Sequence, residues 1–397
     1  MTPTELGEVL HRGSDACALD ELPRALLLRT GGIGHAVVAS LLAQVDGGGE
    51  LLCTVLHLPL AKKEPSWLIR NSRPVLLEAC AKRAEATVQF HRLVYSLECE
   101  GSMASEMYAY RRQLPGTLAA MTVRWLLVWW VSLGYVIRVL DWDESNAYCN
   151  IPRQDLEAAL GSWCPGLGLW ALHFYVTFLI RIATARGLTA VYLMQHGCGQ
   201  GDSGGVGVYT ALGILRTAFH RGVLRGGLWP RDLTGGALCL NDVGLPLPMG
   251  GMLTEIAFSD DRRLFSSTKQ GLARLVGAVA HGCWASGGCA NADKLLLFRV
   301  QLCGSRMVYG VDTPVLTDLG PLPVGKRGLR LTGVPLVSGE IWAAPIDKAV
   351  RRLHLICAGI HRLRPTYVLA LCIVLGSYFS LVPMDDVLGG LRFLCGV

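Results

Sequence analysis

The sequence predicts an α+β fold, on three observations. Residues 135–142 (YVIRVLDW) are an apolar, β-branched run, which is typical of a buried strand. Residues 252–267 (MLTEIAFSDDRRLFSS) hold two short apolar segments on either side of a tight Ser-Asp-Asp turn, which predicts a hairpin. Residues 269–285 are amphipathic, and the pattern after Pro345 is also helical. Strands and helices therefore occupy separate stretches of the chain.

The composition is that of a large globular protein. The chain has 397 residues, of which 51% are hydrophobic and 17% are charged, and this excludes extensive disorder. Its fourteen cysteines form no Cys-x-x-Cys pair, so neither a disulfide framework nor a zinc ribbon is predicted, and the spacing of His281, Cys283 and Cys289 is too irregular for a zinc site. The net charge of +6 permits a polyanionic partner without requiring one.

Two uncharged stretches raise the alternative of a membrane protein. Residues 158–180 are interrupted by Pro165 and several glycines, and residues 366–382 are just long enough to span a bilayer. A packed helix of a large protein explains the second stretch equally well, so we expect no stable membrane association. No basic and then apolar leader follows Met1, which favours an intracellular protein, nuclear or cytoplasmic, over a secreted one.

The stretch HGCGQGDSGGVGVY (196–209) contains Gly-Asp-Ser-Gly-Gly, the pentapeptide around the nucleophile of chymotrypsin-like proteases. Such a protease needs a preceding histidine and carboxylate to activate the serine. No histidine here is followed by cysteine, as the family's is, and Ser203 lies in the middle of the chain. The protease interpretation is therefore rejected.

Carboxylates follow the predicted strand and occupy the tip of the predicted hairpin. Asp141, Asp143 and Glu144 come at the end of the strand, and Asp260 and Asp261 form the turn. Carboxylates on neighbouring strands can share divalent cations, and two such cations can clamp the oxygens of a phosphoryl transfer. The alternative is that these acids are ordinary turn residues.

Four segments, DESNAY, GCGQGD, AFSDD and NADK, occur in the order found in the palm of a reverse transcriptase. Together they resemble the polymerases of non-LTR retrotransposons. The resemblance implies a right-hand fold with fingers, a palm built on a four-stranded antiparallel sheet with helices on one face, and a helical thumb. On this basis we expect fingers and part of the palm at 1–115, the palm at 116–340 with a Gly- and Pro-rich surface insertion at about 221–252, and the thumb at 341–397.

The resemblance also implies the catalytic residues. Asp143, Asp260 and Asp261 are the expected metal ligands, for two Mg²⁺ ions or for Mn²⁺ as a substitute. Asp260 is the second expected ligand after Asp143, and Asp261 is its partner. Lys294 is the candidate acid that protonates the departing pyrophosphate.

The resemblance assigns substrate-binding roles to a further group of residues. Tyr148 would lie against the incoming sugar and exclude a 2′-hydroxyl. Gln200 and Gly201 would lie beside the nascent base pair, where glycine permits a close approach because it has no Cβ. Lys62 and Arg73, and with them Lys82, would bind the triphosphate.

The expected function is therefore that of an RNA-directed DNA polymerase, a nucleotidyltransferase whose partners are an RNA template, a DNA primer and a deoxynucleoside triphosphate. Arg262 and Arg263 depart from the family pattern, which has small or apolar residues in the returning strand, and Gly205-Val206 replaces the usual Ser-Pro pair. A truncated or decayed copy, an inactive nucleic-acid-binding protein of the same fold, and an RNA-directed RNA polymerase are the alternatives.

Overall fold

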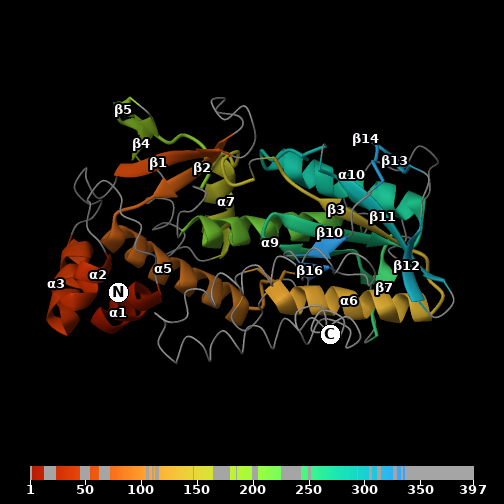
Figure 1. Cartoon of the computed structure of the whole chain (residues 1–397), viewed down its shortest axis with the longest axis horizontal. Coiled ribbons are helices and arrows are strands. Elements are labelled where there is room, and N and C mark those ends of the chain that lie inside the picture. The colour runs from red at the N-terminus through yellow and green to blue at the C-terminus, as the bar shows by residue number, and fades with distance from the viewer. Residues whose placement is uncertain are drawn as a thin grey trace, which may run out of the picture. The chain divides into compact units, whose positions relative to one another are not determined.

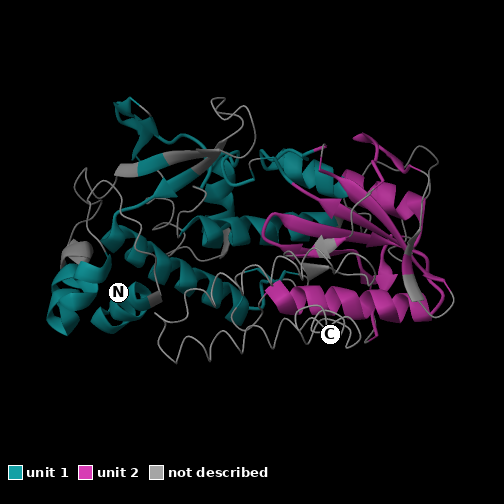
Figure 2. Ribbon diagram, in the orientation of Figure 1, with its two compact units in different colours: residues 1–113, 144–237, 278–291 teal, residues 114–143, 238–277, 292–397 magenta. Residues whose placement is uncertain are grey.

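The structure of the protein is a computed structural model. It describes residues 2–12, 24–44, 54–61, 72–103, 107–109, 111, 116–145, 147–163, 179–184, 186–198, 204–224, 243–248, 252–292, 294–303, 306–310, 314–324, 329–331 and 334–335. The chain divides into two compact units (Figure 2). The first is formed by residues 1–113, 144–237 and 278–291, and the second by residues 114–143, 238–277 and 292–397.

The first unit contains helices and a small sheet. Its helices are α1 (Pro3–Arg12), α2 (Arg24–Arg29), α3 (Gly31–Gln44), α5 (Cys80–Cys99), α7 (Arg153–Trp163) and α9 (Gly205–Leu224). Its strands β1 (Thr54–Ala61), β2 (Ser72–Leu77), β4 (Leu179–Thr184), β5 (Gly187–Leu188) and β6 (Tyr192–Leu193) form a sheet in the order β2-β1-β4-β5, with β6 also paired to β4. Strand β2, which contains Arg73, is followed directly by α5, which carries Lys82.

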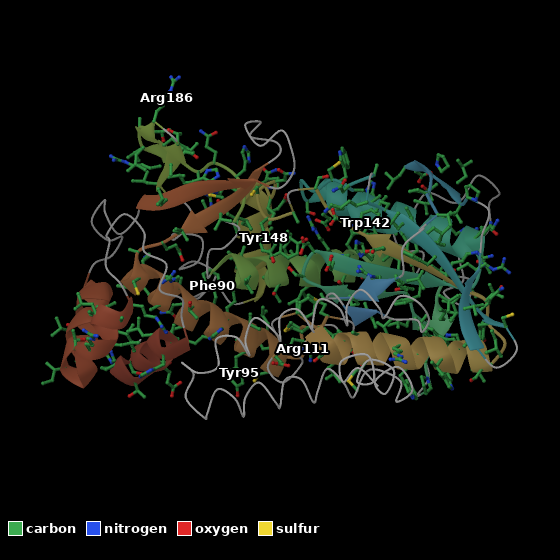
Figure 3. The ribbon with its side chains drawn as sticks, viewed as in Figure 1. Phe90, Tyr95, Arg111, Trp142, Tyr148 and Arg186 are labelled. Atoms are coloured by element: carbon green, nitrogen blue, oxygen red, sulfur yellow. The ribbon has the colours of Figure 1, made fainter. Side chains whose placement is uncertain are left out.

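The core of this unit lies where α5, α7 and α9 pack together. Phe90, on α5, is 2% exposed and lies against Gly204 and Gly207 at the start of α9 (Figure 3). A Cβ at Gly207 would stand 2.7 Å from the Phe90 ring, so glycine is needed for α9 to approach α5 this closely. The glycines after the Gly-Asp-Ser stretch therefore have a packing role.

The second unit is built on one antiparallel sheet and a long helix. The sheet has the order β12-β11-β3-β10-β9, formed by β3 (Ile137–Trp142), β9 (Glu255–Phe258), β10 (Asp261–Ser266), β11 (Leu296–Cys303) and β12 (Arg306–Gly310). Helix α6 (Gly116–Ser132) contacts β3, β9 and β11 and runs along the sheet in Figure 1. Trp130 of α6 is fully buried, with its ring 5.7 Å from that of Phe265 on β10.

The predicted strand and hairpin are confirmed as β3 and the β9–β10 pair, and the amphipathic stretch as α10 (Lys269–Ala285). The sheet has five strands where four were expected. The difference arises because β11 continues to Cys303 and the chain then returns as β12, paired from Arg306, which adds an edge strand. Three short hairpins complete the unit: β7 (Leu245–Pro246) with β8 (Met252–Leu253), β13 (Leu316–Thr317) with β14 (Gly320–Pro321), and β15 (Arg330–Leu331) with β16 (Val334–Pro335).

The predicted surface insertion at 221–252 needs correction at both ends. Helix α9 continues through Leu224, so the insertion begins later than expected. At the other end Val243 and Leu245 are fully buried, and Trp130 Nε1 donates a hydrogen bond of 2.6 Å to Pro246 O. This part belongs to the core because it supplies a strand and a hydrogen-bond acceptor to the region around α6. Residues 225–242 lie outside the described part of the chain.

The predicted thumb, residues 341–397, also lies outside the described residues, together with the uncharged stretch 366–382. Among the helices that the structure describes, none combines the length and the apolar character needed to cross a bilayer. The division into fingers, palm and thumb stays a prediction, since each compact unit is assembled from three separate segments of the chain.

Candidate active site

Three adjacent strands of the second unit place acidic and basic side chains in a regular grid. Asp141 on β3 pairs with Arg263 on β10 at one side and with Leu296 on β11 at the other. Continuing the β3–β10 register by two residues places Asp143 opposite Asp261, the first residue of β10, while Lys294 lies in the turn before β11. Directly opposite residues in antiparallel strands have Cβ atoms about 5 Å apart and point to the same face. The register therefore aligns Asp143 with Asp261 at the strand ends, on the face that also carries Asp141 and Arg263.

Lys294 contacts Asp143 directly. Lys294 Nζ donates hydrogen bonds of 2.8 Å to both Oδ1 and Oδ2 of Asp143. The lysine side chain is 47% exposed and the aspartate 21% exposed, so the pair lies at the edge of the sheet within reach of solvent. Two residues predicted to share a site, 151 positions apart, thus meet through their side chains.

Arg263 and Asp141 form the second ion pair of the grid. Arg263 Nη1 lies 2.7 Å from Asp141 Oδ1, and the arginine side chain is only 5% exposed. Arg263 Nη1 also donates to the carbonyl oxygen of Arg262 at 2.9 Å. Arg263 departs from the pattern of the family that the sequence resembles. Its partner, Asp141, is not one of the metal ligands that the resemblance implies, so the ion pair neutralises an acid without an expected catalytic role.

Burial raises the pKa of Asp141 from 3.8 to about 6. The carboxylates of Asp261 and Asp143 push the pKa in the same direction, whereas Arg263 and Lys294 lower it. A contact of 2.7 Å with a guanidinium would by itself depress the pKa, so burial together with the neighbouring acids outweighs the ion pair. The raised pKa therefore reports mainly the partial removal of the Asp141 carboxylate from water.

Asp260 occupies a different position from Asp261. It lies with Ser259 in the turn between β9 and β10, where Phe258 and Asp261 form the last pair. Ser259 has φ of 61°, and a positive φ at the first of two turn residues is the mark of a type II′ hairpin turn. Asp261 is thus the hairpin acid that the strand register aligns with Asp143, while Asp260 stands at the tip.

Arg262, the other arginine that departs from the family pattern, makes its ion pair outside the grid. Successive residues of a strand point to opposite faces, so its side chain leaves the sheet on the side opposite to Arg263. There Arg262 Nη1 donates a hydrogen bond of 2.8 Å to Glu255 Oε2, and both side chains are almost completely buried. The pair belongs to the core of the β9–β10 hairpin.

The donor set suits a hard cation only in part. Among the described residues, no group of three or more His, Cys, Asp or Glu side chains is arranged to hold a metal ion. Two carboxylates, Asp143 and Asp261, are nevertheless as many protein ligands as a magnesium ion commonly has. Mg²⁺ is usually bound by one or two carboxylates, and waters and substrate phosphates complete its coordination shell.

Tyr148 belongs to the first unit, in a turn held by the loop around Gly197. Cys198 N donates to Tyr148 O at 2.9 Å, and Gly197 N donates to Ile151 O at 2.7 Å. Gly197 has φ of +80°, and a Cβ there would stand 2.6 Å from Tyr148 O. The first glycine of the GCGQGD segment is thus needed to hold the backbone of the Tyr148 turn.

Sequence reasoning missed a buried ion pair in this unit. It grouped Glu144 with the strand-end acids, but the carboxylate of Glu144 is bound by Arg216 of α9, with Nη1 to oxygen distances of 3.0 and 2.8 Å. Tyr209 Oη also donates to Glu144 Oε2 at 3.1 Å. The signal that could have revealed it is a lone arginine inside the apolar run TALGILRTAF, because a buried charge requires a partner.

The remaining predicted substrate contacts are described only in part. Lys62, Gln200 and Gly201 lie outside the described residues. Arg73 is in β2, where it pairs with Leu60 of β1. Lys82, on α5, lies 3.3 Å from Glu85 Oε2, an ion pair within one helical turn.

No protein-family model matches the chain, and no curated protein matches its sequence. Among solved structures, apo telomerase from Candida tropicalis, truncated from its C-terminal domain, aligns over 57% of this chain and 42% of its own, at 13% identity and a TM-score of 0.37. Telomerase from the same organism, in complex with a TWJ fragment of telomeric RNA, aligns over 74% of this chain and 48% of its own, at 12% identity and a TM-score of 0.45.

The chain thus spans less than half the length of either telomerase chain. Matches of this TM-score do not establish a shared fold. The functional assignment depends instead on the strand ends described above.

Proposed function

We propose that the protein is an RNA-directed DNA polymerase of the non-LTR retrotransposon type, which extends a primer 3′-hydroxyl with deoxynucleoside triphosphates on an RNA template. One observation carries the proposal: Asp143, at the end of β3, lies opposite Asp261 of β10 in the continued register, and Lys294 contacts Asp143 from the turn before β11. These residues come from three separate motifs of the sequence, in the order that the resemblance requires. A set of unrelated turn residues has no reason to meet in this way.

Asp143 and Asp261 would hold divalent cations between the primer and the triphosphate, and Asp260 at the hairpin tip is close enough in sequence to contribute. Bound there, two Mg²⁺ ions would polarise the α-phosphate and stabilise charge on the attacking and leaving oxygens. The chain contributes the fixed geometry, because Asp143 directly follows β3 and Asp261 begins β10, two paired strands of one sheet.

Lys294 and Tyr148 have distinct tasks in this proposal. The ammonium of Lys294, which now rests on both oxygens of Asp143, holds a proton at the edge of the site for transfer to the leaving pyrophosphate. The ring of Tyr148 would lie beside the sugar and exclude a 2′-hydroxyl. Asp141, the neighbouring acid of the grid, is bound by Arg263 in an ion pair and has no role in binding the cations.

The test is primer extension by the full chain on an RNA template with Mg²⁺, comparing deoxy- with ribonucleoside triphosphates. We expect the wild type to incorporate deoxynucleotides, and Asp143→Asn and Asp261→Asn to lose activity by at least about a hundredfold, as removal of a central electrostatic group does. Asp260→Asn tests the turn residue separately. Asp318→Asn, at an exposed aspartate of the β13–β14 turn, is the matched control and should extend as the wild type does. No incorporation by the wild type contradicts the proposal.

One observation favours a second function, that of an inactive nucleic-acid-binding protein of the same fold. Both oxygens of Asp143 are already occupied by Lys294, and Asp141 is occupied by Arg263, so the acids are partly neutralised from within. Binding of a primer–template would then depend on salt and would be unchanged by Asp143→Asn, because phosphate contacts and not metal ligands would supply the affinity. A filter-binding titration at two salt concentrations, with wild type and Asp143→Asn, separates this function from the first.

A further inference from the structure

A buried polar network in the first unit connects α9, the turn after Glu144 and the end of α10. Arg216 and Glu144 form its ion pair, with side-chain exposures of 3% and 1%. Arg216 Nε donates a hydrogen bond of 2.6 Å to Ser286 Oγ, which in turn donates to the carbonyl oxygens of Gly282 at 2.9 Å and Cys283 at 3.1 Å. The arginine is therefore fixed from two sides.

Tyr209 joins this network through its hydroxyl and its ring. Its Oη donates to Glu144 Oε2 at 3.1 Å and accepts from Arg216 Nη1 at 3.3 Å. The guanidinium carbon of Arg216 lies 5.7 Å from the centre of the Tyr209 ring, within the range of a cation–π contact. The Tyr209 side chain, 2% exposed, is consequently held in one orientation.

The ring of Tyr209 is packed against that of Tyr148, with centroids 4.6 Å apart and planes inclined by 27°. The backbone of Tyr148 is anchored separately, by the hydrogen bond from Cys198 N. The Tyr209 ring is thus a direct packing partner of the Tyr148 ring. The ion pair, Tyr209 and Tyr148 form a continuous series of contacts within one unit.

We propose that Arg216, with Glu144 and Tyr209, is a positioning device for the ring of Tyr148 and thereby sets the preference for deoxy- over ribonucleoside triphosphates. The proposal deepens the proposed function and rests on it. A tyrosine that excludes a 2′-hydroxyl by steric contact needs its ring fixed, since a displacement of about 1 Å is enough to alter turnover by up to about a hundredfold. Burial of Glu144 and Arg216 costs free energy because both charges lose their contact with water. In return, the buried pair holds the Tyr209 ring in a single orientation.

Three variants separate positioning from folding. Tyr209→Phe removes only the hydroxyl that joins the ring to the ion pair. Glu144→Leu combined with Arg216→Met removes both charges together, so no unpaired charge stays buried and the fold is retained. Arg111→Met is the matched control, because Arg111 forms an ion pair with Glu98 at 3.1 Å in the same unit without contact to the network.

The first measurement needs no catalytic activity. A 3-fluorotyrosine placed at position 148 of the full chain should give one narrow ¹⁹F resonance in the wild type and in Arg111→Met. We expect a broadened or shifted resonance in Tyr209→Phe and a larger change in the Glu144→Leu, Arg216→Met double variant. A spectrum that is the same in all four proteins overturns the positioning role of the network.

The second measurement is the ratio of kcat/KM for a deoxynucleotide to that for the matching ribonucleotide. The two network variants should lower this ratio by between about tenfold and a hundredfold, chiefly through better use of the ribonucleotide. An equal loss for both nucleotides means a purely structural role and overturns the inference. If the wild type incorporates neither nucleotide, the proposed function fails, and the ¹⁹F spectra still decide whether the network positions Tyr148.

Discussion

Asp143 and Asp141 lie on the same face of β3, yet their surroundings differ. Asp143 is held by Lys294, whose side chain is 47% exposed, whereas Asp141 is paired with Arg263, whose side chain is only 5% exposed. An exposed, flexible lysine can yield its place to a cation, whereas a buried guanidinium cannot do so without leaving a buried charge. This contrast is the physical reason to assign the cation to Asp143 and not to Asp141.

Asp141 makes the stability of the fold depend on pH. Because its pKa is raised from 3.8 to about 6 in the folded chain, the folded state binds a proton more readily than the unfolded state between these values. Its contribution is therefore present below pH 3.8 and is lost as the pH rises through about 6. We expect Asp141→Asn to gain on the order of 2 kcal/mol relative to the wild type between about pH 4 and about pH 7.

Urea unfolding of the two proteins at both pH values measures this difference. Asp318→Asn, at an exposed aspartate, serves as the control and should follow the wild type. Parallel pH profiles for wild type and Asp141→Asn are the result that contradicts the assignment.

At this scale the sequence grouped Asp143 with Lys294, and their side chains are in contact, while the shared metal role of Asp143, Asp260 and Asp261 stays a prediction. Asp143 and the hairpin acids directly follow or begin strands, so pairing of the strands is enough to bring them together. Whether Asp260 or Asp261 is aligned with Asp143 depends on register, and a shift of one residue reverses the face of every side chain. Register is set by the packing of the whole sheet, which motif spacing does not contain.

At the scale of elements, the β9–β10 hairpin depends on the buried pair of Arg262 and Glu255. Arg262→Leu leaves Glu255 charged and without its partner in the core, and we expect a loss of about 3 to 5 kcal/mol of unfolding free energy. Adding Glu255→Leu removes the remaining charge and should recover most of that loss. Chemical denaturation of the single and double variants makes the comparison, and equal destabilisation of both would show that the pair is not what stabilises the hairpin.

The turn that carries Tyr148 depends on Gly197. Gly197→Ala meets both a strained φ of +80° and the oxygen of Tyr148 at 2.6 Å, whereas Gly101→Ala meets a φ of +68° with nothing within 4 Å. We expect the substitution at Gly197 to cost about 1 to 3 kcal/mol more than that at Gly101, because only the first adds a steric clash. Thermal unfolding of both variants tests this, and equal costs would contradict the close approach.

Periodicity located α10 and the strands of the hairpin correctly, because each has a clear pattern over its whole length. It missed β12 and placed 243–248 at the surface, since both depend on partners distant in sequence. A short segment such as Val243 to Leu245 carries no periodic signal of its own, and α6 is what makes it part of the core.

At the scale of the whole molecule, each compact unit is assembled from three stretches of chain. Boundaries between units fall within continuous segments, such as Asp143 to Glu144, where no linker composition marks them. The division of the chain therefore carries no signal in the local sequence patterns. The acids of the grid all belong to one unit, so the proposed cation site is formed within that unit alone.

The central claim is that Asp143 and Asp261 together hold a divalent cation. Titration of the full chain with Mn²⁺ tests this claim, with the free ion measured by electron paramagnetic resonance. The measurement does not require the protein to turn over a substrate. The account predicts saturable binding by the wild type, weakening by at least about tenfold in Asp143→Asn and Asp261→Asn, and no change in Asp318→Asn. Lys294→Met should bind Mn²⁺ more tightly than the wild type, because the lysine no longer competes for both oxygens of Asp143. Mn²⁺ binding that is the same in the wild type and in Asp143→Asn, or absent from every one of these proteins, would contradict it.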